Sequence, residues 1–325
     1  MRSYAVSGIL RTRLPGKHAP SDAPKPRWRV SRAALLVAAL PWAWFLVRGV
    51  GAQTEFVAVG IPVVVLSSAT VAALWGLLAR RATALLVIAS LAAFYAVAVF
   101  APRVPGGGPA PADPFRLVAA NPYESNPTPE EAARDLLAQG ADVLAAVEVP
   151  RDVVNGLEGI YPYQIVKNNL AVFSRYPLEP TPRLDGFSRR DVTRVHIDGP
   201  DGPFLLYEVH SPQPLHDISL GAHLAFIRAL RAKALTEPIP VVIAGDFNMS
   251  DRGQGYRLMA ASFRDAMRAG WPAATFDKGL WRLFQLRIDY VFTSRSWCGE
   301  DPDTFGIGGS DHEGIAVTIG PCSRS

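Results

Sequence analysis

The stretch PVVIAGDFN, residues 240–248, places an apolar, β-branched run directly before a carboxylate and an amide. The run from Val241 to Ala244 has the composition of a buried strand. Asp246 and Asn248 follow at its carboxyl end, and residues two positions apart on an extended chain point to the same side. The stretch therefore predicts a strand of an α/β fold that presents two polar side chains at the sheet edge where such folds assemble sites.

The same pattern extends in both directions from this strand. From Phe115 onward, short apolar runs alternate with amphipathic stretches, which indicates layered α/β packing. One helix is expected to begin at the capping box Thr128-Pro129-Glu130-Glu131 and to end at Gly140, and two more are expected at 215–236 and about 254–269. Strands are expected at residues 115–121, 142–148, 170–174, 193–197, 204–210, 240–247, 287–293 and 314–319.

Polar side chains stand at the ends of several predicted strands. A single aspartate after a strand is usually a turn former or a helix cap, so one such residue would carry little information. Five polar residues at the ends of four predicted strands indicate a shared site, and these are Asn121, Glu148, His210, Asp246 and Asn248. The sequence therefore predicts a site at one edge of the sheet.

A sixth polar residue lies inside an apolar strand. The sequence IDYVF, residues 288–292, surrounds Asp289 with apolar side chains, which is costly unless the carboxylate meets a cation or a hydrogen-bond donor. The segment Ser310-Asp311-His312 supplies a suitable donor. Oxygen ligands favour Mg²⁺ or Mn²⁺, and the shortage of His and Cys argues against structural zinc. The candidate oxygen ligands are Glu148, Asp246, Asn248 and Asp311.

The apolar excess of the chain lies almost entirely before residue 103. Three segments, 33–47, 56–79 and 82–102, contain no Asp, Glu, Lys or Arg. They predict three transmembrane helices at about 33–52, 56–79 and 82–102, although the first is short and needs snorkelling of its flanking arginines to span. The open alternative is a cleaved signal peptide, because residues 33–47 have the length of its apolar region.

Charge predicts the orientation of these helices. The segment 1–32 carries eight Lys or Arg residues and one acidic residue, Asp22, which predicts a cytoplasmic N-terminus. Three crossings then place residues 115–325 outside the cytoplasmic membrane as one domain, after a Pro- and Gly-rich linker at 103–114. This basic segment contributes to the pI of about 9.2, so the pI says little about the substrate. Because the region after residue 115 has no Lys/Arg cluster, no stable nucleic-acid partner is expected.

The only two cysteines, Cys298 and Cys322, lie in the predicted external domain. In an oxidising compartment they would close a loop that contains Ser310-Asp311-His312. The alternative is two unrelated thiols. The sequence leaves both possibilities open.

The motifs GDFN, IDYVF and SDH in this order, with an upstream Asn and Glu, resemble the endonuclease/exonuclease/phosphatase superfamily, typified by DNase I, apurinic endonucleases and bacterial sphingomyelinases. The resemblance covers about residues 115–320. It implies a DNase I-like four-layer α/β sandwich, in which two packed mixed sheets are flanked by helices, here preceded by the three transmembrane helices. It also implies a phosphoric ester or diphosphate hydrolase that depends on Mg²⁺ or Mn²⁺.

The resemblance implies a metal and substrate site as follows. Glu148 and Asp311 would ligate the metal, and Asn121 would orient a phosphate oxygen or contact the metal. Arg175, in LAVFSRYPL, would be either structural or a phosphate contact. The chain departs from the family at Val147, where relatives commonly carry Gln, and in the residues directly after Asn121.

The resemblance also implies the catalytic roles. His210 would act on the phosphoryl group as an acid or charge stabiliser, while Asp246 and Asn248 would position the attacking water and the scissile phosphate. His312, oriented by Asp289, would act as the general base. A catalytically inactive module that binds a lipid-linked ligand is the alternative from a different class, but all expected catalytic positions are filled.

Location narrows the substrate. A site tethered by about a dozen linker residues stays near the lipid headgroups of the bilayer, which favours a lipid-phosphate substrate. The layout resembles the VanJ-type teicoplanin-resistance membrane proteins, and this resemblance implies hydrolysis of undecaprenyl pyrophosphate. A membrane-tethered nuclease and a phospholipase- or sphingomyelinase-like phosphodiesterase remain the alternatives.

Overall fold

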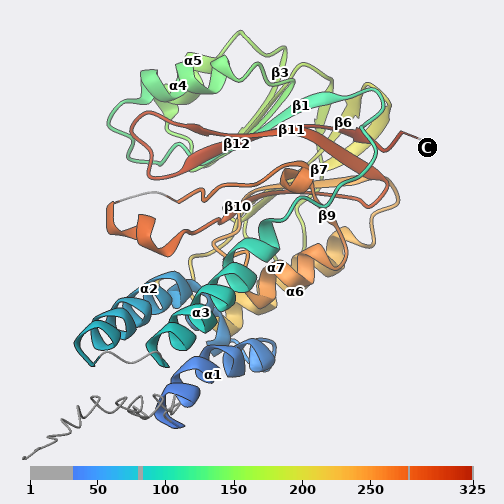
Figure 1. Cartoon of the computed structure of the whole chain (residues 1–325). Helices are drawn as coiled ribbons and strands as arrows, with labels where there is room; N and C mark the ends of the chain where they lie inside the picture. The colour runs from blue at the N-terminus through green and yellow to red at the C-terminus, as the bar shows by residue number, and fades with distance from the viewer. Residues whose placement is uncertain (1–31, 80–82, 277–278, 324–325) are drawn as a thin grey trace, which may run out of the picture.

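The computed structural model describes residues 32–79, 83–276 and 279–323 (Figure 1). The predicted basic segment 1–32 therefore lies outside the described residues except for Arg32. Residues 80–82, between the second and third predicted helices, lie outside them as well.

Two mixed six-stranded sheets form the body of the fold. The first has the order β11 (Trp297–Gly306), β12 (Glu313–Pro321), β1 (Phe115–Ala120), β2 (Val143–Val147), β4 (Leu170–Ser174) and β3 (Tyr163–Lys167). The second has the order β5 (Leu178–Pro180), β6 (Val192–Gly199), β7 (Gly202–His210), β8 (Val241–Asp246), β10 (Asp289–Thr293) and β9 (Arg264–Asp265). The pairs β1–β2 and β7–β8 are parallel, and the remaining pairs are antiparallel.

Three apolar cores stack the domain into four layers. One core joins the facing sheets, with residues such as Leu117, Val172 and Leu206. The second lies between the first sheet and helices α4 (Pro129–Ala138) and α5 (Arg151–Leu157), and the third between the second sheet and helices α6 (Leu220–Ala234) and α7 (Gln254–Ala260). Figure 1 shows the two helical layers on opposite sides of the paired sheets. The expected α/β sandwich is confirmed.

All eight predicted strands form, and the helices need correction. The helix predicted at 128–139 forms as α4, but the Thr128 side chain makes no capping hydrogen bond, so the proline and the two glutamates carry its start. The helix predicted at 254–269 ends at Ala260, after which the chain forms β9 and the short helix η3 (Ala266–Ala269). Helix α6 begins at Leu220, capped by Ser219, rather than at residue 215.

Two of the three predicted spans have the length and composition to cross a membrane. These are Gln53–Trp75 of α2 (Gln53–Ala79) and Thr83–Arg103, which comprises α3 (Thr83–Tyr95), the π-helix η1 (Ala96–Phe100) and the 3₁₀ turn η2 (Ala101–Arg103). Helix α1 (Arg32–Val47) is shorter, and its apolar stretch Leu35–Val47 does not reach that length. The expectation of three spans is therefore supported for two, and such helices suit a membrane anchor or a signal sequence.

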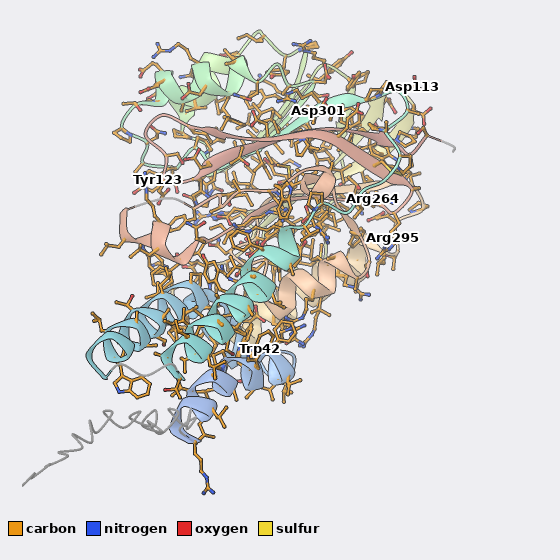
Figure 2. The ribbon with its side chains drawn as sticks, viewed as in Figure 1. Trp42, Asp113, Tyr123, Arg264, Arg295 and Asp301 are labelled. Atoms are coloured by element: carbon orange, nitrogen blue, oxygen red, sulfur yellow. A yellow bond between two sulfur atoms is a disulfide. The ribbon has the colours of Figure 1, made fainter. Side chains whose placement is uncertain are left out.

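The three helices pack on one another and leave apolar side chains uncovered. Trp42 of α1, labelled in Figure 2, donates a hydrogen bond to Ser90 of α3. Aromatic and aliphatic side chains of the three helices form a fourth core. On the outer faces, Val64, Val71 and Leu85 are 62%, 66% and 68% exposed. Many exposed apolar side chains on one helical unit are typical of a lipid or protein contact.

The end of this helical unit is bound to the α/β domain. Arg103 Nε donates to Asp251 Oδ2 over 2.7 Å, with both side chains buried. Glu55, near the start of α2, accepts a hydrogen bond from the backbone amide of Gln254 at the start of α7. Residues 106 and 112 of the predicted linker bond to the backbone of the domain as well, so this segment lies along the sandwich.

Cys298 and Cys322 form a disulfide between the start of β11 and the segment after β12. Their backbones are adjacent because Cys298 pairs with Gly320 in the antiparallel ladder. The bond lies at the end of β11–β12 opposite to His312, which directly precedes β12.

Candidate active site

The predicted site residues converge because four strands end at one edge of the sandwich. Asn121 directly follows β1 and Glu148 directly follows β2, the parallel pair of the first sheet. In the second sheet, register pairs His210 with Asp246 across β7 and β8, and Asp246 with Asp289 across β8 and β10. Figure 2 shows Tyr123, just after β1, at this end and Asp113, just before it, at the other.

Asn121 connects the two halves of the cluster. Its Nδ2 donates to Glu148 Oε1 over 3.1 Å and to Asp246 Oδ2 over 3.4 Å, and it lies 3.5 Å from His312 Nε2. His210 Nε2 lies 3.0 Å from the same Glu148 oxygen. Because Asn121 and Glu148 belong to one sheet and His210 and Asp246 to the other, these contacts span the interface between the sheets.

His312 is held between two carboxylates. Its Nδ1 lies 3.0 Å from Asp289 Oδ2, and its Nε2 lies 3.8 Å from Asp246 Oδ2. Burial by itself lowers the pKa of His312, but the charges of Asp289 and Asp246 outweigh it and raise the pKa to about 10. Positive charge bound beside these carboxylates would bring the pKa back toward neutrality.

The carboxylates of the cluster differ in their pKa values. The pKa of Asp246 is raised to about 6, because burial together with the neighbouring charge of Asp289 outweighs the opposing charge of His312. Burial also raises the pKa of Glu148, but hydrogen bonds from His210 and Asn121 overcome it and lower the pKa to about 2. His210 has a raised pKa because Glu148 and Asp246 outweigh its burial. The cluster thus concentrates negative charge where a cation or imidazolium is needed to balance it.

Three residues at or near the cluster have backbone conformations that non-glycine residues rarely adopt. Tyr123, Glu148 and Asn248 have positive φ values of 69°, 49° and 47°. Non-glycine residues hold such conformations only when their surroundings enforce them, and they concentrate at functional sites. The Asn248 amide donates to Asp246 Oδ1 over 2.8 Å, and its Nδ2 donates to the Ser211 carbonyl over 2.9 Å, so the turn after β8 is braced on the segment after β7.

The donor set fits a hard divalent cation. Two groups of ligand atoms converge within 4.8 Å among the described residues, namely Glu148, His210 and Asp246, and Asp246, Asp289 and His312. Carboxylate oxygens and the Asn121 amide suit Mg²⁺ or Mn²⁺. Asp311, the other expected ligand, is half-buried beside His312 and contributes to its raised pKa, but belongs to neither group. Its role as a ligand remains a prediction.

Arg175 requires a correction. It follows the end of β4, and the antiparallel pairing of Leu170 with Val147 and of Ser174 with Val143 puts it at the edge of the sheet opposite to Glu148. There its guanidinium lies 3.7 Å from Asp142 Oδ1. The expected phosphate contact is therefore wrong, and the structural alternative for Arg175 stays a prediction.

Sequence reasoning missed the residues that support the cluster from behind. Thr275 Oγ1 accepts hydrogen bonds from the amides of Ile288 and Asp289, and the Phe276 ring meets the His312 ring edge to face at 5.1 Å. His223 of α6 lies 3.1 Å from Ser211 Oγ and is buried. These residues lie in segments without strand or motif patterns, so only their contacts reveal them.

Comparisons with known proteins agree with this geometry. The model of the Endonuclease/Exonuclease/phosphatase family matches residues 106–312. Among solved structures, the chain is similar to a humanized D. rerio TDP2 (15% identity, TM-score 0.52, covering 64% of this chain and 99% of that one). It is also similar to an endonuclease/exonuclease/phosphatase from Bacteroides vulgatus (14% identity, TM-score 0.52, covering 65% and 100%).

Identities this low establish the fold and not the substrate. A comparison with curated protein sequences found no match. The family match extends over more than half of the chain and includes the whole cluster from Asn121 to His312. The chain therefore belongs to the endonuclease/exonuclease/phosphatase family, whose members are phosphoesterases that typically depend on a divalent metal.

Proposed function

We propose that this protein is a membrane-anchored, metal-dependent phosphoesterase that hydrolyses a lipid-linked phosphate such as undecaprenyl pyrophosphate at the outer face of the cytoplasmic membrane. The observation that carries the proposal is the attachment of the catalytic segment to the apolar helices. Asp251, five residues after Asp246, is the buried partner of Arg103 at the end of the second candidate span. This attachment supports a site held at the membrane surface, where lipid headgroups lie.

The cluster supports hydrolysis by direct attack of water. His312, fixed by Asp289, would accept the proton of the attacking water, and Asn248 and Asp246 would position that water and the phosphate. His210 would donate a hydrogen bond to charge that develops on the phosphoryl group. Glu148 and Asp311, with Asn121, would hold Mg²⁺ or Mn²⁺, which neutralises charge on the phosphate oxygens when bound.

The proposed orientation has a cytoplasmic N-terminus and three crossings, with α1 as a short first span. It is consistent with the contacts of Glu55, at the start of α2, and Arg103, at the end of η2, because both bind the α/β domain and both would lie on the outer side. Hydrolysis of a cell-wall lipid carrier outside the membrane would change glycopeptide susceptibility, so we expect disruption of the gene to change teicoplanin susceptibility.

The test is release of inorganic phosphate from undecaprenyl pyrophosphate by the full-length protein in detergent, with Mg²⁺ or Mn²⁺ supplied or chelated. We expect release that requires the metal and is lost in Asp246→Ala. Asp198→Ala, at an exposed position of β6, is the matched control and should retain activity. Folded, metal-loaded protein that releases no phosphate would overturn this substrate, and assays of DNA nicking and phospholipid diester cleavage would then identify a nuclease or a phosphodiesterase.

A further inference from the structure

A cavity of about 420 Å³ lies between helix α2 and the α/β domain. We call it the α2 groove. Its walls come from the first turns of α2, from the segment between β7 and α6, and from the segment that contains the short helix η4 (Gly279–Phe284). The side chains that carry the argument are Phe56, Val59, Leu215, Trp281, Leu286 and Ile288. They are all apolar or aromatic, so the groove suits a hydrocarbon ligand.

One end of the groove is the catalytic cluster. Asn248 lines the groove while its Nδ2 lies 3.3 Å from Asp246 Oδ2. Ile288 lines it directly before Asp289, and Phe276 lines it while its ring contacts His312. A ligand in the groove therefore lies within reach of the residues that would bind a phosphate.

The other end of the groove is the apolar surface of α2. Phe56 lines the groove and is 62% exposed, and α2 continues without a charged residue from there to Trp75. Gly60, one turn further along, also lines the groove, and a Cβ added there would meet no heavy atom of the described residues within 4 Å. The groove therefore joins the site to the helix face that meets lipid in the proposed membrane anchor.

We propose that the α2 groove holds the hydrocarbon chain of a phosphorylated lipid while the phosphate lies at the catalytic cluster, which contains Asn121, Asp246 and His312. This inference rests on the proposed function and specifies its substrate class as long-chain amphiphiles. The polar end and the apolar walls match a molecule with a charged head and an extended apolar chain. A small polar phosphoester would leave these walls without a partner, because it has no apolar chain to lay against them.

Two substrates with the same headgroup separate the chain from the chemistry. Undecaprenyl pyrophosphate carries a long isoprenoid chain, and dimethylallyl pyrophosphate carries a short one. The variant Gly60→Leu fills the groove from a position with free space, and the larger residue also favours the helix, so folding should be retained. Val59→Trp fills the groove from the neighbouring position, and Val57→Trp, which lies on α2 outside the groove, is its matched control.

We expect Gly60→Leu and Val59→Trp to lower kcat/KM for the long substrate by about tenfold or more, since two lost methylene contacts suffice for that factor. For the short substrate, the two groove variants and Val57→Trp should keep the kcat/KM of the wild type. Val57→Trp should also keep the wild-type value for the long substrate. Equal losses on both substrates, or no loss on either, would overturn the groove assignment.

A binding experiment distinguishes failure of the groove from failure of the proposed function. If the wild-type protein hydrolyses neither pyrophosphate, the proposed substrate is wrong and the groove is tested separately with a long-chain alkyl phosphate that carries a terminal diazirine. Cross-links at Phe56, Val59 or Trp281 that disappear in Gly60→Leu would support a lipid-chain site. Cross-links elsewhere, unaffected by this variant, would refute it.

Discussion

At the scale of single residues, Asp289 determines the charge state and orientation of His312. Replacing it by asparagine keeps the size of the side chain but removes the negative charge 3.0 Å from the imidazole. Because that charge raises the pKa of His312, we expect the pKa to fall in Asp289→Asn, and the acidic limb of the kcat/KM profile to move to lower pH. The rate itself should fall by about 10²–10⁴-fold, the usual contribution of a positioned base.

The measurement is the pH dependence of phosphate release with saturating Mg²⁺. Asp198→Asn is a matched control, because Asp198 pairs with His196 at 3.7 Å on the surface of β6, away from the site. That variant should leave the profile unchanged. An Asp289→Asn enzyme with an unshifted acidic limb would show that His312 is not the group that titrates.

Glu208 is a buried carboxyl group outside the cluster, on β7. Its Oε1 accepts a hydrogen bond from the Ala171 amide of the other sheet, and burial raises its pKa well above the usual value. The folded protein therefore retains a proton that the unfolded chain releases above about pH 4.3, so this group makes stability fall as pH rises, by up to about 1.4 kcal/mol per pH unit. Glu208→Gln should flatten that dependence.

Thermal unfolding of the two proteins between pH 5 and pH 8 measures the effect. We expect the Tm of Glu208→Gln minus the Tm of the wild type to increase as pH increases. Glu179→Gln, at an exposed position of β5, should follow the wild-type curve. Parallel curves for wild type and Glu208→Gln would mean that the carboxyl group is ionised in the folded protein.

At the scale of elements, the ion pair between Arg103 and Asp251 joins the last turn of the helical unit to the segment after β8. Arg103 also donates to the Gln285 carbonyl over 2.7 Å. Arg103→Met leaves the carboxylate of Asp251 buried without its cation, which typically costs about 3–5 kcal/mol. The double variant Arg103→Met/Asp251→Leu removes both charges and should recover most of that loss.

The Tm of the detergent-solubilised proteins is the readout. Arg175→Met, which breaks an exposed pair with Asp142 where the arginine side chain is 57% exposed, should change stability by less than about 1 kcal/mol. It should also leave phosphate release unchanged, since Arg175 lies away from the site. A small effect of Arg103→Met, similar to that of Arg175→Met, would refute a rigid connection between the two units.

Edge strands explain where element prediction failed. The missed strand β3 has mostly exposed side chains, because it pairs on one side only, with β4. The missed strand β11 contains Pro302 and a register shift between Glu300 and Asp303, and its composition argues against a strand. Each of these strands forms on the next strand along the chain, which supplies its hydrogen-bond ladder, and the pattern within the strand itself does not record that pairing.

At the scale of the whole molecule, the Cys298–Cys322 disulfide closes the last two strands of the first sheet. The loop between its cysteines, 24 positions apart, contains His312. Loss of the bond in Cys298→Ser/Cys322→Ser should cost about 3 kcal/mol, and thus lower the Tm by roughly 6–12 °C for a domain of this size. Because the bond lies at the far end of β11–β12 from His312, the specific activity of the folded variant should be unchanged.

Unfolding with and without reductant checks this prediction. Wild-type protein should lose stability on reduction, whereas the double serine variant should be insensitive. Identical melting of both proteins under oxidising conditions would show that the two thiols are unpaired in solution.

The sequence by itself determined the α/β class, the eight inner strands and the order of the motif residues. These features follow from local composition: a β-branched run such as Val241–Ile243 favours a buried strand, and α2 has no charged residue after Glu55. The family resemblance then pointed to Asn121, Glu148, Asp246 and His312, because their chemistry needs those residue types at those strand ends.

Only the tertiary structure decided which strand ends meet and what lies beside them. Arg175 follows a correctly predicted strand, but antiparallel pairing puts it at the edge of the sheet opposite to Glu148. The support of Asp289 by Thr275, the pair of Arg103 with Asp251 and the α2 groove all join segments far apart in the chain. Contacts of this kind depend on packing across elements, and neither periodicity nor composition within one segment encodes them.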